Sequence, residues 1–142
     1  MKVIDGLLYD TVGFTCSCFD LLHAGHIIML QYAKARCDKL IVGLQTDPTI
    51  DRSDTKNKPI QSVDERRIQL EAVRYIDEVF TYGTEEELYK KLLDIKPDVR
   101  ILGSDYIGKS FTGDDLDIKI YYHERNHNYS STNLRKKVCG II

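Results

Sequence analysis

Residues 18–26 read CFDLLHAGH, a stretch that joins a predicted strand to a predicted helix. The run that leads into it, VGFTCSC at 12–18, is short, apolar and typical of a strand. From Leu22 to Cys37 the apolar residues recur at helical spacing. His23 and His26 therefore lie three residues apart at the start of a helix, on one face of its first turn.

The chemistry of this helix start favours a phosphate ligand. Unpaired backbone N–H groups and the positive end of the helix dipole attract phosphate. Imidazole donates to phosphate oxygens whether it is neutral or cationic, and a nearby anion favours the cation. Gly25 has no side chain, so a ligand or another backbone segment can come close. We therefore predict a polyphosphate site at residues 18–26.

Length and composition set the outer limits of the interpretation. The chain has 142 residues, 42% apolar and 30% charged, which predicts a single domain over 1–142 with a short N-terminal extension at 1–10. The net charge of −2 argues against nucleic-acid binding, and no apolar run is long enough for membrane insertion. Residues 1–10 lack the apolar segment of a signal peptide. Four irregularly spaced cysteines, at 16, 18, 37 and 139, predict reduced thiols and a cytoplasmic protein.

Strands and helices alternate along the rest of the chain. The apolar run at 39–45 predicts a strand buried on both faces. Capping-box pairs start helices at Ser62, with Glu65, and at Thr84, with Glu87. Further strands are predicted at 78–81, 99–102 and 118–122, and a last helix from Ser130 or Ser131 to Cys139. This order predicts an α/β fold, a Rossmann-like three-layer α/β/α domain with a parallel sheet of about five strands, whose ligands bind at the carboxyl ends of the strands.

Four stretches together carry a resemblance to a known family. They are DLLHAGH at 20–26, VRYIDEV at 73–79, GSDYIGK at 103–109 and RNHNYSST at 125–132. In this order the chain resembles the nucleotidyltransferase superfamily with the HxGH motif, within it the cytidylyltransferases, and most of all the small bacterial glycerol-3-phosphate cytidylyltransferases.

The resemblance implies roles for the matching residues. Residues implied to be catalytic are His23, His26, Lys58, Arg66 and Arg125. Residues implied to bind the nucleotide are Cys18, Phe19, Gly25, His26, Lys56, Arg74, Asp105, Ser130, Ser131 and Thr132. Arg66 is preferred over the adjacent Arg67 by its motif position, and Arg74 has a subunit interface as its alternative role. No residue is predicted to bind a metal directly.

The implied reaction transfers CMP from CTP to a small phosphorylated alcohol, with glycerol 3-phosphate as the leading acceptor. The products would be a CDP-alcohol, used for a bacterial cell-surface polymer, and pyrophosphate. The acceptor phosphate is already an anion, so catalysis rests on positioning and on electrostatic stabilisation of the transition state. The family implies Mg²⁺ bound with the triphosphate, and a homodimer.

Two departures from the family keep other interpretations open. Ser17 and Cys18 replace a Gly-Thr pair, and 83–85 lacks an aromatic residue that glycerol-phosphate enzymes carry, which weakens the case for that acceptor. The first alternative is an adenylyltransferase that acts on a sugar phosphate or another phosphomonoester. The second is a non-catalytic nucleotide- or metal-binding module, with zinc held by two cysteines and two histidines, at 16, 18, 23 and 26.

Several single residues also have ordinary structural explanations. Ser130 and its neighbours could simply cap the last helix, and Lys56 and Lys58 could belong to a solvated loop. His123 and His127 match no motif and are interpreted as surface residues.

Overall fold

The structure is a computed structural model that describes residues 2–53 and 58–140. The elements of the described ranges follow one another as strand and helix, as the sequence predicts. The strands are β1 (Lys2–Ile4), β2 (Leu7–Tyr9), β3 (Val12–Ser17), β4 (Lys39–Gln45), β5 (Glu78–Tyr82), β6 (Val99–Gly103) and β7 (Lys119–His123). The helices are α1 (Ala24–Lys34), α2 (Val63–Glu71), α3 (Glu85–Ile95), the short 3₁₀ helix η1 (Ser104–Tyr106) and α4 (Ser131–Val138).

The described residues form one five-stranded parallel sheet in the order β5-β4-β3-β6-β7. Within this sheet the chain forms the central strand β3 first and then adds β4 and β5 on one side of it. It then crosses to the other side of β3, where β6 and β7 follow. Strand order thus reverses between β3 and β6, which opens a crevice at their carboxyl ends. The predicted Rossmann-like α/β/α fold with about five parallel strands is confirmed.

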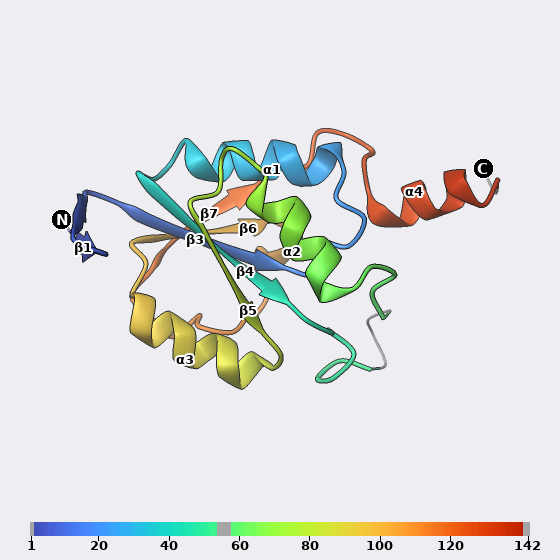
Figure 1. The fold of residues 1–142 in the computed structure, drawn as a ribbon. Coiled ribbons are helices and arrows are strands. Elements are labelled where there is room, and N and C mark those ends of the chain that lie inside the picture. The colour runs from blue at the N-terminus through green and yellow to red at the C-terminus, as the bar shows by residue number, and fades with distance from the viewer. Residues whose placement is uncertain (1, 54–57, 141–142) are drawn as a thin grey trace.

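Helices cover both faces of this sheet (Figure 1). One core cluster packs Leu30 of α1 and Leu70 of α2 against β4 and β6. The other packs Leu88 and Leu92 of α3 against Phe14 of β3. All seven residues of β4 are buried, as the continuous apolar run at 39–45 predicts.

The two predicted capping boxes differ in outcome. At α2, Ser62 accepts from the Glu65 backbone N–H, and the Glu65 carboxylate accepts from the Ser62 N–H, so the box is complete. At α3, Thr84 accepts from the Glu87 N–H at 3.2 Å, but the Glu87 carboxylate accepts from Gly83 instead of Thr84. The helix starts where predicted, although only half of its predicted box forms.

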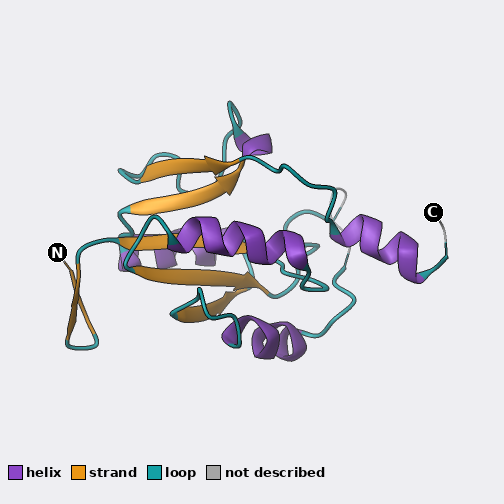
Figure 2. Cartoon of the chain, turned by 90° about the horizontal axis from the view of Figure 1, so that it is seen from above, coloured by secondary structure: helices purple, strands orange, loops and turns teal. Residues whose placement is uncertain are grey.

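The N-terminal extension forms a structure that the sequence pattern does not predict. β1 and β2 pair as an antiparallel hairpin. Its turn residues, Asp5 and Gly6, both have positive φ, as a tight two-residue hairpin turn requires. The hairpin lies at one end of the molecule and α4 at the other (Figure 2). Across the described residues, every helix is too short or too polar to cross a membrane.

Candidate active site

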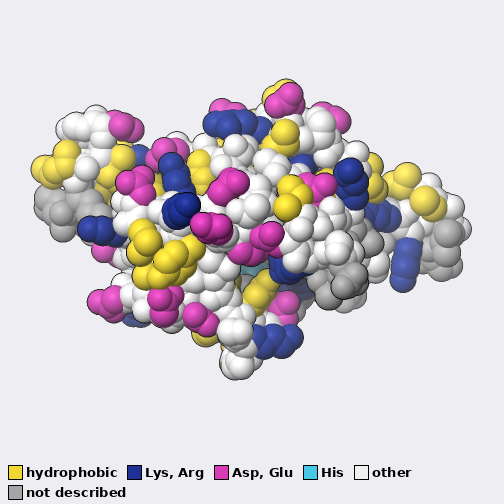
Figure 3. Space-filling view, turned by 90° about the horizontal axis from the view of Figure 1, so that it is seen from below, with side chains coloured by type: hydrophobic (Ala, Val, Ile, Leu, Met, Phe, Trp, Pro, Cys, Tyr) yellow, Lys and Arg dark blue, Asp and Glu magenta, His cyan; other side chains and the backbone are white. Residues whose placement is uncertain are grey.

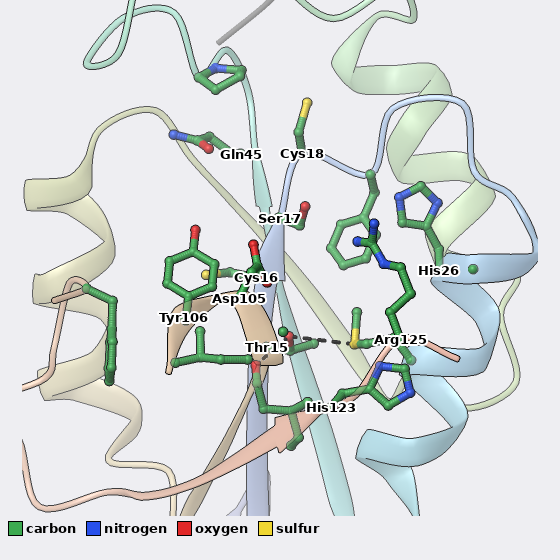
Figure 4. Close-up of a pocket in the computed structure, with 18 of the residues that line it drawn as sticks. Thr15, Cys16, Ser17, Cys18, His26, Gln45, Asp105, Tyr106, His123 and Arg125 are labelled. Carbon is green, nitrogen blue, oxygen red and sulfur yellow. Dashed lines mark hydrogen bonds between the residues drawn. The ribbon is translucent and has the colours of Figure 1, made fainter. Parts of the chain in front are cut away.

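A cavity of about 560 Å³ lies at the carboxyl ends of the sheet strands. Its walls come from the ends of β3, β4, β6 and β7, from the start of α1, and from the segment that leads into α4 (Figure 4). On the face that carries α3, a hollow shows a histidine side chain within it and charged side chains around its rim (Figure 3). The crevice between β3 and β6 therefore holds the cavity, where a doubly wound sheet binds its ligands.

The two histidines of the HAGH stretch cap α1 with their own side chains. His23 is the N-cap residue, and its Nδ1 accepts from the Gly25 N–H at 3.0 Å. The His26 Nδ1 accepts from the His23 N–H at 3.1 Å, and the two ring centroids lie 3.9 Å apart. Because each Nδ1 accepts a backbone proton, the proton of each neutral ring lies on Nε2. Both imidazoles line the cavity, so each brings a neutral donor to it.

Burial sets the protonation state of this pair. Desolvation, followed by the charges of His23 and Arg125, lowers the pKa of His26 to about 4. Desolvation and Arg125 also lower the pKa of His23. Protonation at Nδ1 would remove the acceptor that caps α1, so the cap and the low pKa reinforce each other.

We expect this pKa shift to make stability depend on pH. The unfolded chain binds a proton at His26 near the ordinary pKa of 6.5, but the folded chain does so only near 4, so the free energy of unfolding falls as pH drops through this window. The loss attributable to His26 is at most about 3 kcal/mol. Urea unfolding between these pH values measures it, and a His26→Asn variant should show a shallower slope. An unchanged slope in the variant would contradict the assignment.

Gly25 is required for a reason other than the predicted one. A Cβ at this position would lie 2.8 Å from Cε1 of His23 and 3.0 Å from Cε1 of His127. The space is thus filled by two imidazole rings of the protein itself, and this corrects the expectation that it is left free for a ligand or another backbone segment.

The loop that precedes α1 is strained and is held by a buried carboxylate. Phe19 and Leu21 have φ near +50°, a conformation that costs about 1–3 kcal/mol per residue. Between them, Asp20 is 6% exposed. Its carboxylate accepts from the N–H groups of Ile60 and Gln61 and from Arg135 of α4, each within 3.0 Å. Asp20 therefore joins the HAGH loop, the segment before α2, and the last helix.

Arg66 is buried beneath the same loop instead of lying in the cavity. Its side chain is 2% exposed. The guanidinium donates to the carbonyls of Cys18, Gln45 and Thr46 at 2.6–2.9 Å, and its Nε lies near the carbonyls that precede α2. This differs from the predicted contact with substrate phosphate: Arg66 is a positioning residue that fixes the ends of β3 and β4. Arg67 pairs with Glu71 on the surface, and neither of these adjacent arginines lines the cavity.

The segment between β7 and α4 forms the wall beside the histidines. Arg125 lines the cavity together with His123 and His127, which corrects the interpretation of both histidines as surface residues. Ser130 is the N-cap of α4, and its Oγ accepts from Asn133. The Ser131 hydroxyl donates to the Asp20 carbonyl at 3.0 Å. The two serines thus cap and tether α4 at the edge of the cavity.

Of the remaining predicted site residues, some line the cavity and others do not. Cys18, Phe19 and Asp105 line the cavity, with Phe19 fully buried beneath His26 at a ring distance of 5.5 Å. Three described residues of the predicted set do not line it. Arg74 is exposed and donates to the Tyr75 hydroxyl, Thr132 is exposed on α4, and Lys58 lies 3.9 Å from Asp47 on the surface. Lys56 lies outside the described residues.

The cysteines near the histidines do not form the zinc site of the second alternative. Within the described parts of the chain, no three His, Cys, Asp or Glu side chains are placed to hold a metal ion. Cys16 instead faces the α3 side, where its sulfur accepts from Arg100 at 3.7 Å, and Cys18 lies against Arg66. Both thiols are free, and burial raises the pKa of each.

The doubly wound sheet, the imidazole-capped helix at its switch point, and the arginine-lined cavity define a nucleotide-binding domain of the nucleotidyltransferase type. Residues 14–137 match the family model described as cytidylyltransferase-like, so the chain belongs to that family. The sequence resemblance to this superfamily is confirmed.

Similar proteins support the same class. The bifunctional protein HldE of Paramagnetospirillum magneticum is 38% identical over 133 residues, which are 91% of this chain and 27% of that protein. HldE of Helicobacter pylori is 36% identical over 138 residues, which are 96% of this chain and 30% of that protein. The chain therefore spans less than a third of these relatives.

Solved structures give a matching fold. The lipopolysaccharide core biosynthesis protein of Thermoplasma volcanium has a TM-score of 0.65 at 26% identity, covering 84% of this chain and 98% of that one. Pantoate-beta-alanine ligase of Francisella tularensis, at 21% identity, covers 88% of this chain and 65% of that one. It shares the fold alone, with a TM-score of 0.60.

Proposed function

We propose that the chain transfers a nucleoside monophosphate from a nucleoside triphosphate to the phosphate of a small sugar phosphate, releasing pyrophosphate. The observation that carries this proposal is the pair of Nε2–H donors at the start of α1, which line the same cavity as Arg125. Similarity to HldE and to a lipopolysaccharide core biosynthesis protein supports a sugar phosphate as the acceptor.

The proposed reaction is an in-line displacement at the α-phosphorus. An oxygen of the acceptor phosphate forms a bond to phosphorus while the bond to the β-phosphate breaks, and pyrophosphate leaves. His23 and His26 would donate from Nε2 to phosphate oxygens, and Arg125 would neutralise charge on the leaving pyrophosphate. Because the donors are fixed by the helix cap, they need no reorganisation as charge develops.

Cytidylyl transfer to glycerol 3-phosphate is the second candidate. The cytidylyltransferase-like family model and the position of Arg125 five residues before the Ser-Ser pair favour CTP. Similarity to HldE favours the sugar phosphate. The two candidates share the phosphate chemistry and differ in the base of the donor and in the body of the acceptor.

Mg²⁺, a homodimer and a cytoplasmic location complete the proposal. Mg²⁺ would arrive with the triphosphate and would reduce the negative charge of its phosphates. Such an ion is held mainly by phosphate and water and needs one or two carboxylates, and the Asp105 carboxylate lies at the same cavity.

Pyrophosphate release tests the proposed function. We expect release with CTP or ATP, Mg²⁺ and one acceptor from a panel of heptose 1-phosphate, ribitol phosphate, glycerol 3-phosphate, choline phosphate and ethanolamine phosphate. Arg125→Gln should raise the KM for the nucleotide by about tenfold, the loss of one charged hydrogen bond. Arg67→Gln, a surface arginine paired with Glu71, is the matched control and should leave KM unchanged. Nucleotide binding without release across the whole panel would support a non-catalytic module.

A further inference from the structure

A second lobe of the cavity lies on the α3 side of β3, opposite the proposed triphosphate site. Gln45 ends β4 and lies across β3 from His26 and Arg125 (Figure 4). Arg100 of β6 and Glu85, the first residue of α3, line the same cavity. We call the group formed by Gln45, Arg52, Glu85 and Arg100 the α3 lobe. The proposed phosphate chemistry uses none of these four residues.

The α3 lobe contains buried donors that have no protein partner. Gln45 is 2% exposed and Arg100 is 3% exposed. Among the described residues, Gln45 Nε2, Arg100 Nε and Arg52 Nε are buried donors that have no hydrogen-bond partner. The other nitrogens of Arg100 donate to the Thr112 carbonyl and to the Cys16 sulfur. A buried donor without a partner costs about 1–3 kcal/mol, so these three atoms indicate a ligand that supplies acceptor oxygens.

The same lobe contains a carboxylate acceptor. Glu85 accepts from the Thr112 hydroxyl at 2.9 Å and lies 3.7 Å from Arg52. The Asp51 carboxylate accepts from the Glu85 backbone N–H at 2.6 Å, at the start of α3. We therefore do not count Asp51 among the residues of the α3 lobe. Two arginines thus lie in the lobe with the Glu85 carboxylate, and the Asp105 carboxylate lines the same cavity. A hydroxyl group both donates and accepts, and this mixture of donors with a carboxylate matches hydroxyl groups better than it matches a phosphate alone.

We propose that the α3 lobe binds the hydroxyl groups of the acceptor's sugar and excludes acceptors that carry a cation. The inference rests on the proposed function and specifies the acceptor class. A choline or ethanolamine head group would place a third cation beside Arg52 and Arg100, and it would offer their unpartnered nitrogens no acceptor oxygen. Glu85 also lies in the stretch 83–85, where the sequence departs from the glycerol-phosphate pattern. The departure thus places an acidic group at the acceptor side of the cavity.

Two substitutions test the α3 lobe. Gln45→Glu replaces a donor by an acceptor at nearly the same volume, and Glu85→Gln removes the carboxylate at a partly exposed site where folding is retained more readily. Gln31→Glu, exposed on α1, is the matched control. Calorimetry with heptose 1-phosphate and a non-hydrolysable ATP or CTP analogue measures both ligands without turnover. We expect each lobe variant to weaken sugar-phosphate binding by about tenfold and to change analogue binding by less than about twofold.

The outcomes separate this inference from the proposed function. Weaker sugar-phosphate binding in both variants supports the α3 lobe even if the wild type releases no pyrophosphate, in which case only the proposed function fails. Release of pyrophosphate with unchanged sugar-phosphate affinity in both variants overturns the proposal for the α3 lobe and leaves the proposed function standing. Choline phosphate bound as tightly as heptose 1-phosphate, or no sugar-phosphate binding by the wild type, also overturns it. Thermal unfolding confirms that each variant is folded, and Glu85→Gln decides the test if Gln45→Glu is not.

Discussion

Replacing His26 with asparagine is expected to reduce pyrophosphate release by at least about a hundredfold while leaving the fold intact. His26 has two separate tasks, because Nδ1 caps the His23 N–H and Nε2 presents a proton to the cavity. The asparagine oxygen lies near the position of Nδ1 and continues the cap. Its side chain is too short to place a donor where Nε2 lies. Steady-state rates and the midpoint of thermal unfolding measure the two tasks separately.

Replacing His26 with glutamine should instead keep the donor in the cavity and remove the cap. Its amide nitrogen reaches the place of Nε2 but its oxygen does not cap His23, so we expect a loss of about tenfold in rate and about 1 kcal/mol in stability. The asparagine variant should therefore be the more stable of the two, and the glutamine variant should be the faster. The same order in both measurements would mean that capping and donation are not divided between the two ring nitrogens.

Replacing Arg66 with methionine is expected to lower the free energy of unfolding by about 3 kcal/mol. Methionine keeps the length of the buried side chain but leaves the carbonyls of Cys18, Gln45 and Thr46 without their donor. Those carbonyls lie at the ends of β3 and β4, so the geometry of the cavity should change as well. Urea unfolding monitored by circular dichroism measures the loss.

Arg67→Met is the control for this prediction. It removes a surface ion pair with Glu71 on the same helix, which is worth less than about 1 kcal/mol. If the two variants were equally stable, the buried guanidinium would not be the group that fixes the strand ends. If Arg66→Met lost activity at full stability, the residue would act on the substrate as the sequence resemblance implies.

The fold could be predicted from sequence where one periodicity dominates. The run at 39–45 is apolar throughout, and β4 has the same bounds because a central parallel strand is buried on both faces. The helix predicted from Leu22 to Cys37 is shorter, at Ala24–Lys34, because His23 caps its first turn. The hairpin at 2–9 is not predictable from the sequence pattern, because strands of three residues carry no periodic signal and its turn is marked only by Asp5-Gly6.

The site could be predicted only where a local motif marks it. His23 and His26 are recognisable because their spacing and the helix start belong to one stretch. Gln45 and Arg100 are each a single polar residue in an apolar strand, and their convergence depends on sheet order, which no local pattern shows. The position of His123 at the carboxyl end of the last strand was the available signal for its place in the cavity.

The separation of the N-terminal hairpin from the cavity has a practical consequence. β1 and β2 precede the amino end of β3 (Figure 1), whereas the cavity lies at the carboxyl ends of the strands, so the two features lie at opposite ends of the strands. An affinity tag, a surface anchor or a fused protein joined before residue 2 would leave the mouth of the cavity clear. The chain can thus be immobilised or linked through its first strand without obstructing substrate entry, which makes that end the natural attachment point for biosensor or tandem-enzyme constructions.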